Sequence, residues 1–243
     1  MSVKYYIGCS GWHYEHWRGL YYPEELPKSK WLSFYARQFN TVELNNSFYR
    51  LPSEKAFTTW QESTPDNFVF SVKGSRFITH IKRLKNLGSA VENFLSRASL
   101  LGEKLGPLLY QLPPNMKRND DLLESFLSSL PPEYQHVIEF RHESWIDDAV
   151  FDILRGRNVG LCVFDMPGFG CPLVATSDFA YVRFHGSEGL YSSCYSDEEL
   201  SQWAHKIARL GQNVKASYIY FNNDAEAFAV KNAITLGNFL NIP

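Results

Sequence analysis

The segment IEFRHESW at residues 138–145 places two opposite charges on one face of a predicted strand. Strand side chains alternate between two faces, so Glu139 and Arg141 share one face while Ile138 and Phe140 share the other. A carboxylate and a guanidinium that point the same way form either a buried structural ion pair or part of a ligand site. The choice depends on where the other strands place their polar groups.

Proton-transferring residues occur late in three of the apolar segments. We expect Glu43, Glu139 and His185 to be the catalytic groups, because carboxyl and imidazole groups act as general acids and bases. The two glutamates would serve as acid and base, or as the nucleophile and acid of a glycosidase-type reaction. The alternative for His185 is a histidine whose hydrogen bonds are satisfied within the protein.

Several cations accompany these groups, which favours an anionic ligand. Lys73, Arg76, Arg141 and Arg183 follow or end apolar runs, and a guanidinium matches phosphate or carboxylate in a two-pronged hydrogen bond. Phosphate is the first choice; the competing interpretation is that Glu43, Glu139 and Asp165 neutralise the cations. The predicted substrate-binding residues are Trp12, Asn45, Lys73, Arg76, Gln111, Arg141, Arg183, Asn222 and Asp224.

Eight short, apolar, β-rich runs must position these groups. They are residues 5–10, 41–44, 68–73, 107–112, 136–140, 159–164, 180–185 and 217–222. Helical patterns fill most of the gaps, at residues 29–38, 53–62, 88–101, 120–129, 147–156, 197–210 and 226–239. Start signals support several of these helices, including Ser53, Asn119 and the box from Ser196 to Glu199.

This alternation predicts an α/β fold with a parallel sheet. Eight strands in 243 residues favour a single (β/α)₈ barrel of the TIM type, in which residues 1–243 form one domain. An irregular segment, residues 166–179, is expected in place of the helix between strands six and seven. An open doubly wound sheet is the weaker alternative, since no GxGxxG follows the first strand.

In such a barrel the ligand site lies at the carboxyl ends of the strands, the barrel mouth. We phased each strand by turning its most apolar face outward toward the helices. The inward residues are then Glu43, Asn45, Ser71, Lys73, Gln111, Glu139, Arg141, Asp165, Tyr181, Arg183, His185, Tyr218, Tyr220, Asn222 and Asp224. Strand six is apolar on both faces, so the pattern supports the inward position of Asp165 less strongly than it supports the other inward positions. Because burying a charge costs several kcal/mol, this polar set indicates a ligand or active site.

The loop after the first strand, SGWHYEHWRG at residues 10–19, interleaves aromatic and polar side chains. Trp12, Tyr14 and Trp17 would stack on a sugar or a base. The alternative is a loop packed over the barrel mouth, or an aromatic anchor for the first helix. After the third strand, Arg76 and His80 are expected near Lys73.

Composition sets limits on partners and surroundings. The net charge of −2 gives no bulk attraction to polyanions, so nucleic acid is not favoured as a partner. No window approaches the roughly 20 apolar residues of a membrane span, and we expect a cytoplasmic protein with four reduced cysteines. No cofactor is predicted. A divalent metal held by Glu43, Glu139, Asp165, His185 and Asp224 is an alternative that no HExxH-type signature supports.

Seven segments in this order resemble the YecE-like family, also catalogued as domain of unknown function 72. They are GCSGWHYEHWRGLYYP, FNTVELNNSFYRLP, FVFSVKGSRFITH, LGPLLYQLPP, IEFRHESW, YVRFHG and YFNNDAEAFAVKNA. The resemblance implies a TIM barrel and no established reaction. The family pattern falls on Ser10, Gly11, Trp12, Glu43, Asn45, Phe48, Tyr49, Lys73, Thr79, His80, Gln111, Pro113, Glu139, Arg141, His142, Trp145, Arg183, His185, Gly186, Asn222, Asn223 and Asp224. Cys9 departs from it, because the family more often has threonine there.

Three functions therefore remain open. The first is a hydrolase or related acid–base catalyst acting on a phosphorylated or otherwise anionic substrate. The second is a non-catalytic binder of a nucleotide, sugar phosphate or single-stranded nucleic acid. The third is a hydrolase or isomerase that depends on a divalent metal.

Overall fold

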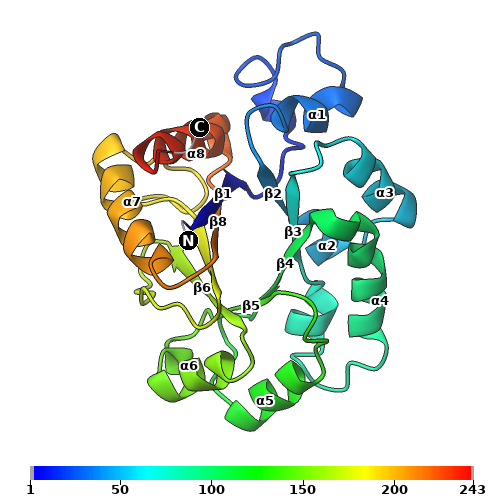
Figure 1. The fold of residues 1–243 in the computed structure, drawn as a ribbon, viewed down its shortest axis with the longest axis vertical. Coiled ribbons are helices and arrows are strands. Elements are labelled where there is room, and N and C mark those ends of the chain that lie inside the picture. Colours follow the sequence, from blue (N-terminus) through cyan, green and yellow to red (C-terminus); the bar gives the residue numbers. More distant parts are fainter. Residues whose placement is uncertain (1–2, 242–243) are drawn as a thin grey trace.

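Eight parallel strands form one sheet that curves around a central axis, with the helices outside it (Figure 1). The computed structural model describes residues 3–241. The strands are β1 Lys4–Cys9, β2 Thr41–Leu44, β3 Val69–Lys73, β4 Leu105–Gln111, β5 His136–Glu139, β6 Gly160–Asp165, β7 Phe179–Phe184 and β8 Ala216–Phe221. Their order is β1-β8-β7-β6-β5-β4-β3-β2. The predicted (β/α)₈ barrel of TIM type is confirmed.

The helices lie close to the predicted ranges. They are α1 Trp31–Tyr35, α2 Asn46–Tyr49, α3 Glu54–Glu62, α4 Ala90–Ala98, α5 Asp120–Ser128, α6 Asp148–Arg155, α7 Asp197–Gly211 and α8 Phe228–Phe239. Ser53 and Asn119 cap α3 and α5 as predicted, and Ser196 and Glu199 form a complete capping box on α7. Helix α2, directly after β2, was not predicted, because four residues are too few to show a helical period.

Short helical turns complete the connections: η1 Glu15–Trp17, η2 Lys28–Lys30, η3 Phe77–Ile81, η4 Ser99–Lys104, η5 Glu143–Trp145 and η6 Ala225–Ala227. Between β6 and β7 the described chain contains no helix, which confirms the irregular segment. No helix among residues 3–241 is both long and apolar enough to cross a membrane. The single domain over residues 1–243 stays a prediction, and residues 1, 2, 242 and 243 lie outside the described part.

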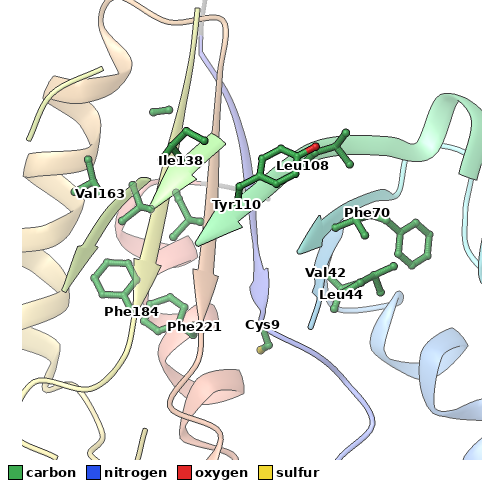
Figure 2. Close-up of a cluster of buried hydrophobic side chains, with 14 of the residues drawn as sticks. Cys9, Val42, Leu44, Phe70, Leu108, Tyr110, Ile138, Val163, Phe184 and Phe221 are labelled. Carbon is green, nitrogen blue, oxygen red and sulfur yellow. The ribbon is translucent and has the colours of Figure 1, made fainter. Parts of the chain in front are cut away.

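The sheet is buried on both faces, as expected of a parallel barrel. Its outer face carries aliphatic and aromatic side chains such as Val42, Phe70 and Ile138, which pack against the helices (Figure 2). Inside the barrel, Tyr6, Leu109, Val137, Cys162, Phe164, Phe179, Tyr181, Tyr218 and Tyr220 form a second buried cluster. This cluster extends from Tyr6 and Phe179 near the amino-terminal end of the barrel to Phe164, whose ring lies against Arg141.

The edge between β1 and β2 is joined by a side chain. The Tyr35 hydroxyl accepts a hydrogen bond from the Cys9 amide at 2.7 Å and donates one to the Thr41 carbonyl at 3.0 Å. Gly8 permits this close approach, because a Cβ there would lie 2.2 Å from the Thr41 oxygen and 2.7 Å from the Tyr35 hydroxyl. The buried tyrosine therefore replaces ladder hydrogen bonds where the barrel closes.

Candidate functional site

Five ionisable side chains from the ends of three strands, β2, β5 and β7, meet inside the barrel mouth. Glu43, Glu139, Arg141, Arg183 and His185 form what we call the mouth network. Arg183 is its centre: Nη2 donates to Glu43 Oε2 at 2.9 Å and Nη1 donates to Glu139 Oε2 at 2.7 Å. The side chains of Arg183 and both glutamates are fully buried. One guanidinium thus bridges two carboxylates that are 96 residues apart in the sequence.

Nitrogen atoms of three side chains donate hydrogen bonds to the Glu139 carboxylate. Arg141 Nε and Arg183 Nη1 donate to it, and Gln111 Nε2 donates to Oε1 at 2.9 Å. Burial alone would raise the pKa of Glu139, but the charges of Arg141 and Arg183 outweigh it and hold that pKa well below its usual range. Glu139 is therefore held as an anion between Arg141, Arg183 and Gln111.

Glu43 has fewer partners than Glu139. Its Oε1 accepts a hydrogen bond from the Tyr181 hydroxyl at 2.7 Å, and its Oε2 accepts one from Arg183. Glu43 also lines a pocket that opens beside the first loop. Of the two glutamates, Glu43 is the one that lines this pocket, although its side chain is fully buried.

His185 is neutral and its two ring nitrogens have different roles. Burial, followed by the charge of Arg183, lowers its pKa well below the usual range. Arg141 Nη2 lies 2.8 Å from Nε2, and because arginine only donates, Nε2 must be the acceptor. The proton is then on Nδ1, and because Asn222 Nδ2 lies 3.2 Å from it, a hydrogen bond there requires the Asn222 amide to be turned so that its oxygen faces the ring. His185 thus accepts a hydrogen bond from Arg141 and orients its guanidinium group.

Lys73, at the end of β3, differs from the two arginines. Its ammonium makes no hydrogen bond or ion pair with any described residue, although the side chain is only 9% exposed. The Nζ atom lies 4.5 Å from the centre of the Phe48 ring. Burial, and then the charge of Arg183, lowers the pKa of Lys73 to about 8. Direct ion pairs with the two glutamates are therefore made by Arg141 and Arg183, whereas Glu139 and Glu43 act on Lys73 only through their charge.

The segment after β3 adds positive charge at the rim. Arg76 is exposed, and burial together with the charges of Lys73 and Arg76 lowers the pKa of His80. His80 packs edge-on against Phe48 at 5.0 Å, on the same ring that lies under Lys73. The predicted proximity of Arg76 and His80 to Lys73 is consistent with these contacts.

Asp165 and Asp224 were predicted to face inward, and in the described part of the chain neither carboxylate has a hydrogen bond or ion pair with the mouth network. Asp165 points outward beside Tyr195 and Lys206, where burial raises its pKa. The inward residues of β6 are Cys162 and Phe164, so the phase predicted for this strand was wrong. Asp224 lies against the first loop, where its carboxylate is 3.6 Å from His16 and its carbonyl accepts a hydrogen bond from Trp17.

The aromatic loop divides into an anchor and a pocket wall. Trp17 is fully buried, its Nε1 is bonded to the Asp224 carbonyl at 2.8 Å, and it packs beside Tyr22, which stacks on Trp31. Trp17 is therefore not free to stack on a ligand, and the interpretation as an anchor holds for it. Trp12 instead lines the pocket beside Asn45.

Strand phasing missed part of this pocket. Tyr49 and Trp60 line it from α2 and α3, and Ser10 lines it from the end of β1. Trp60 lies on a helix of ordinary amphipathic pattern, which gives no sign that one of its side chains reaches the mouth. Among residues 3–241 no group of three or more His, Cys, Asp or Glu side chains is placed to hold a metal ion.

Comparison with protein families places the chain among proteins of unknown function. The model described as "Protein of unknown function DUF72" matches residues 6–243. The UPF0759 protein YecE of Escherichia coli K12 is 36% identical over 138 residues, and the chain spans only 48% of that relative's length. The UPF0759 protein YunF of Bacillus subtilis is 26% identical over 98% of the chain and 95% of its own length.

Solved structures agree with this placement. A DUF72 family protein of Thermotoga maritima is 33% identical, with a TM-score of 0.89 over 98% of this chain and 99% of that one. A methyltransferase from Methanosarcina mazei has a TM-score of 0.54 at 12% identity and covers 99% of this chain and 93% of that one. The second likeness concerns the fold alone.

Proposed function

The chain belongs to the DUF72 family of proteins of unknown function, and from its site we propose that it is an enzyme acting on a phosphorylated or otherwise anionic small molecule. The reaction would be a hydrolysis or a related acid–base step at the barrel mouth. The family and the barrel fold by themselves name no reaction, so the proposal rests on the side chains of the mouth.

The observation that carries the proposal is the unpartnered ammonium of Lys73. The mouth holds three cations, Lys73, Arg141 and Arg183, against two carboxylates, Glu43 and Glu139, with His185 neutral. Both arginines are paired with glutamates, which leaves the mostly buried Lys73 side chain as the one of these three cations without a hydrogen bond or ion pair to a described residue. A buried charge without a partner destabilises the fold. An anionic ligand would supply the partner.

The same geometry separates the roles of the two glutamates. Glu139 is bonded to Arg141, Arg183 and Gln111, so we assign it to holding the guanidinium groups in place. Glu43 lines the pocket and accepts hydrogen bonds from Arg183 and Tyr181. This position suits it to accept or donate the proton of a bound substrate. His185 contributes by fixing Arg141 in its orientation.

The test compares binding and turnover in matched variants. Phosphate monoesters, phosphate diesters and carboxylate esters are screened for turnover, and the binding of inorganic phosphate is measured by calorimetry. We expect Lys73→Met to weaken phosphate binding by about tenfold or more, as loss of a charge-assisted contact should. Glu43→Gln should retain binding and lose turnover. The control is Lys231→Met on the exposed side of α8, which makes the same change in charge away from the mouth.

Two results would decide against the proposal. If Lys73→Met binds phosphate as tightly as the wild type, Lys73 is not an anion site. If an anionic ligand binds through Lys73 and no ester is turned over, the binding function without catalysis is the better account.

A further inference from the structure

An aromatic pocket lies beside the anion site, and its volume is about 520 Å³. It opens between the first loop, the end of β2 and helix α3. Its walls include Trp12, Tyr14, Tyr49 and Trp60, and its polar lining includes Ser10, Glu43 and Asn45. We call this space the aromatic pocket. The pocket is larger than a single phosphate requires.

Two buried oxygen atoms of the pocket lining have no hydrogen-bond partner among the described residues: Ser10 Oγ and Asn45 Oδ1. The orientation of the Asn45 amide is fixed, because its Nδ2 donates to the Ser10 carbonyl at 3.1 Å and a carbonyl can only accept. Asn45 Oδ1 is therefore committed as an acceptor. Ser10 is only 1% exposed, so its hydroxyl is buried without a hydrogen-bond partner among the described residues.

The pocket is held in shape before any ligand enters. The Tyr14 hydroxyl donates to the Ser10 carbonyl at 2.6 Å, and the Tyr22 hydroxyl donates to the Trp12 carbonyl at 2.6 Å. Trp12 and Trp60 meet edge to face with their ring centres 5.5 Å apart. Rigid aromatic walls with a few fixed polar groups are typical of small-molecule sites.

The anion site and the pocket adjoin each other across α2. Strands β2 and β3 pair with Glu43 opposite Ser71, so Asn45, directly after β2, and Lys73, the last residue of β3, lie at neighbouring strand ends. The Ser47 hydroxyl donates to the Lys73 carbonyl at 2.6 Å, and Phe48 lies under the Lys73 ammonium. The next residue, Tyr49, lines the pocket.

We propose that the aromatic pocket binds the ring of a phosphate ester, a sugar or a base that carries hydroxyl or amino donors, while the phosphate lies at Lys73. The aromatic walls suit stacking on such a ring. Asn45 Oδ1 and the Glu43 carboxylate accept hydrogen bonds, so the ring must present donors on this side. This inference rests on the proposed function for the anionic end of the ligand and adds the class of its ring.

The experiment measures dissociation constants by calorimetry for inorganic phosphate, glucose 6-phosphate, the nucleoside 5′-monophosphates and the corresponding unphosphorylated sugar and nucleosides. We expect at least one ring phosphate to bind about tenfold or more tightly than inorganic phosphate. Whether the sugar phosphate or a nucleotide shows that gain tells which ring the pocket accepts.

Ser10→Ala is the most selective variant, because it removes an unpartnered hydroxyl and breaks no hydrogen bond of the described structure. It should reduce the gain in affinity that the ring provides and leave the affinity for inorganic phosphate unchanged. Asn45→Ala should also reduce the gain in affinity that the ring provides. The matched control is Ser217→Ala, since Ser217 on β8 is also buried with an unpartnered hydroxyl but lies near the start of its strand, away from the mouth.

The outcomes separate the two proposals. Equal affinities for ring phosphates and inorganic phosphate, or a gain that both Ser10→Ala and Asn45→Ala leave intact, would overturn the pocket assignment and leave the anion site standing. Ring binding that depends on Ser10 but not on Lys73 would support the pocket and contradict the anion site.

Discussion

Lys73 and Lys104 are both buried lysines, but only the ammonium of Lys104 has hydrogen-bond partners. Lys104 Nζ donates to the Gln61 carbonyl at 2.6 Å and to the Thr64 carbonyl at 2.7 Å. Lys73 Nζ has no such partner among the described residues and lies in the mouth. Lys104 is therefore held within the fold, whereas Lys73 is the lysine that we propose binds the anionic ligand.

The two lysines should respond to the same substitution in opposite ways. Lys73→Met should stabilise the protein at pH 7 by up to about 3 kcal/mol, because a pKa lowered from 10.5 to about 8 corresponds to a penalty of that size. Lys104→Met should destabilise it by roughly 2–4 kcal/mol, because two carbonyls lose a charged donor. Urea unfolding of both variants measures the difference. Loss of stability in Lys73→Met would mean that the ammonium has a partner.

Stability should also depend on pH through Lys73. Between about pH 8 and 10.5 the unfolded chain keeps this proton while the folded protein releases it, so the free energy of unfolding gains from Lys73 as pH rises. The advantage of Lys73→Met over the wild type should shrink across this range. Unfolding curves of both proteins at pH 7, 8, 9 and 10 follow this difference, and an advantage that stays constant with pH would contradict it.

The centre of the mouth network should tolerate loss of Arg183 poorly. Arg183→Met leaves Glu43 and Glu139 buried without their shared cation, and removal of one member of a buried ion pair costs roughly 3–5 kcal/mol. Adding Glu43→Gln to this variant should recover part of the loss, since it removes one of the stranded charges. A double variant no more stable than Arg183→Met alone would show that Glu43 does not depend on Arg183.

The closure of the barrel supplies another test. Tyr35→Phe leaves the Cys9 amide and the Thr41 carbonyl without the hydroxyl that joins them, which should cost about 1–3 kcal/mol. Hydrogen exchange at the Cys9 amide should then accelerate more than exchange at amides of β7 and β8. Unchanged protection at Cys9 would mean that β1 and β2 close without Tyr35.

The barrel and most of the polar mouth were predictable because strand alternation is a strong signal. Glu43, Lys73, Glu139 and Arg183 each follow an apolar neighbour on a strand with one clearly apolar face, so their phase was fixed. β6 lacks such a contrast, and its inward Cys162 and Phe164 are as apolar as its outward residues. The phase of Asp165 was wrong for that reason.

Other features depend on contacts that no local pattern encodes. The sequence places Glu139 and Arg141 on one face, but only the fold brings Arg183 and Gln111 to the same carboxylate and leaves Lys73 without a partner. The pocket wall from Trp60 likewise depends on how α3 packs beside the first loop. Packing between distant segments decided which charges were already paired.

The most direct measurement is a titration of the Lys73 ammonium itself, followed by NMR of its side-chain carbon and nitrogen nuclei with and without inorganic phosphate. We expect a pKa near 8 in the free protein and a clear upward shift when phosphate binds, because the anion stabilises the charged form of Lys73. If phosphate leaves the pKa of Lys73 unchanged, or if that pKa is near 10.5 in the free protein, then Lys73 is not a buried cation that binds an anionic ligand.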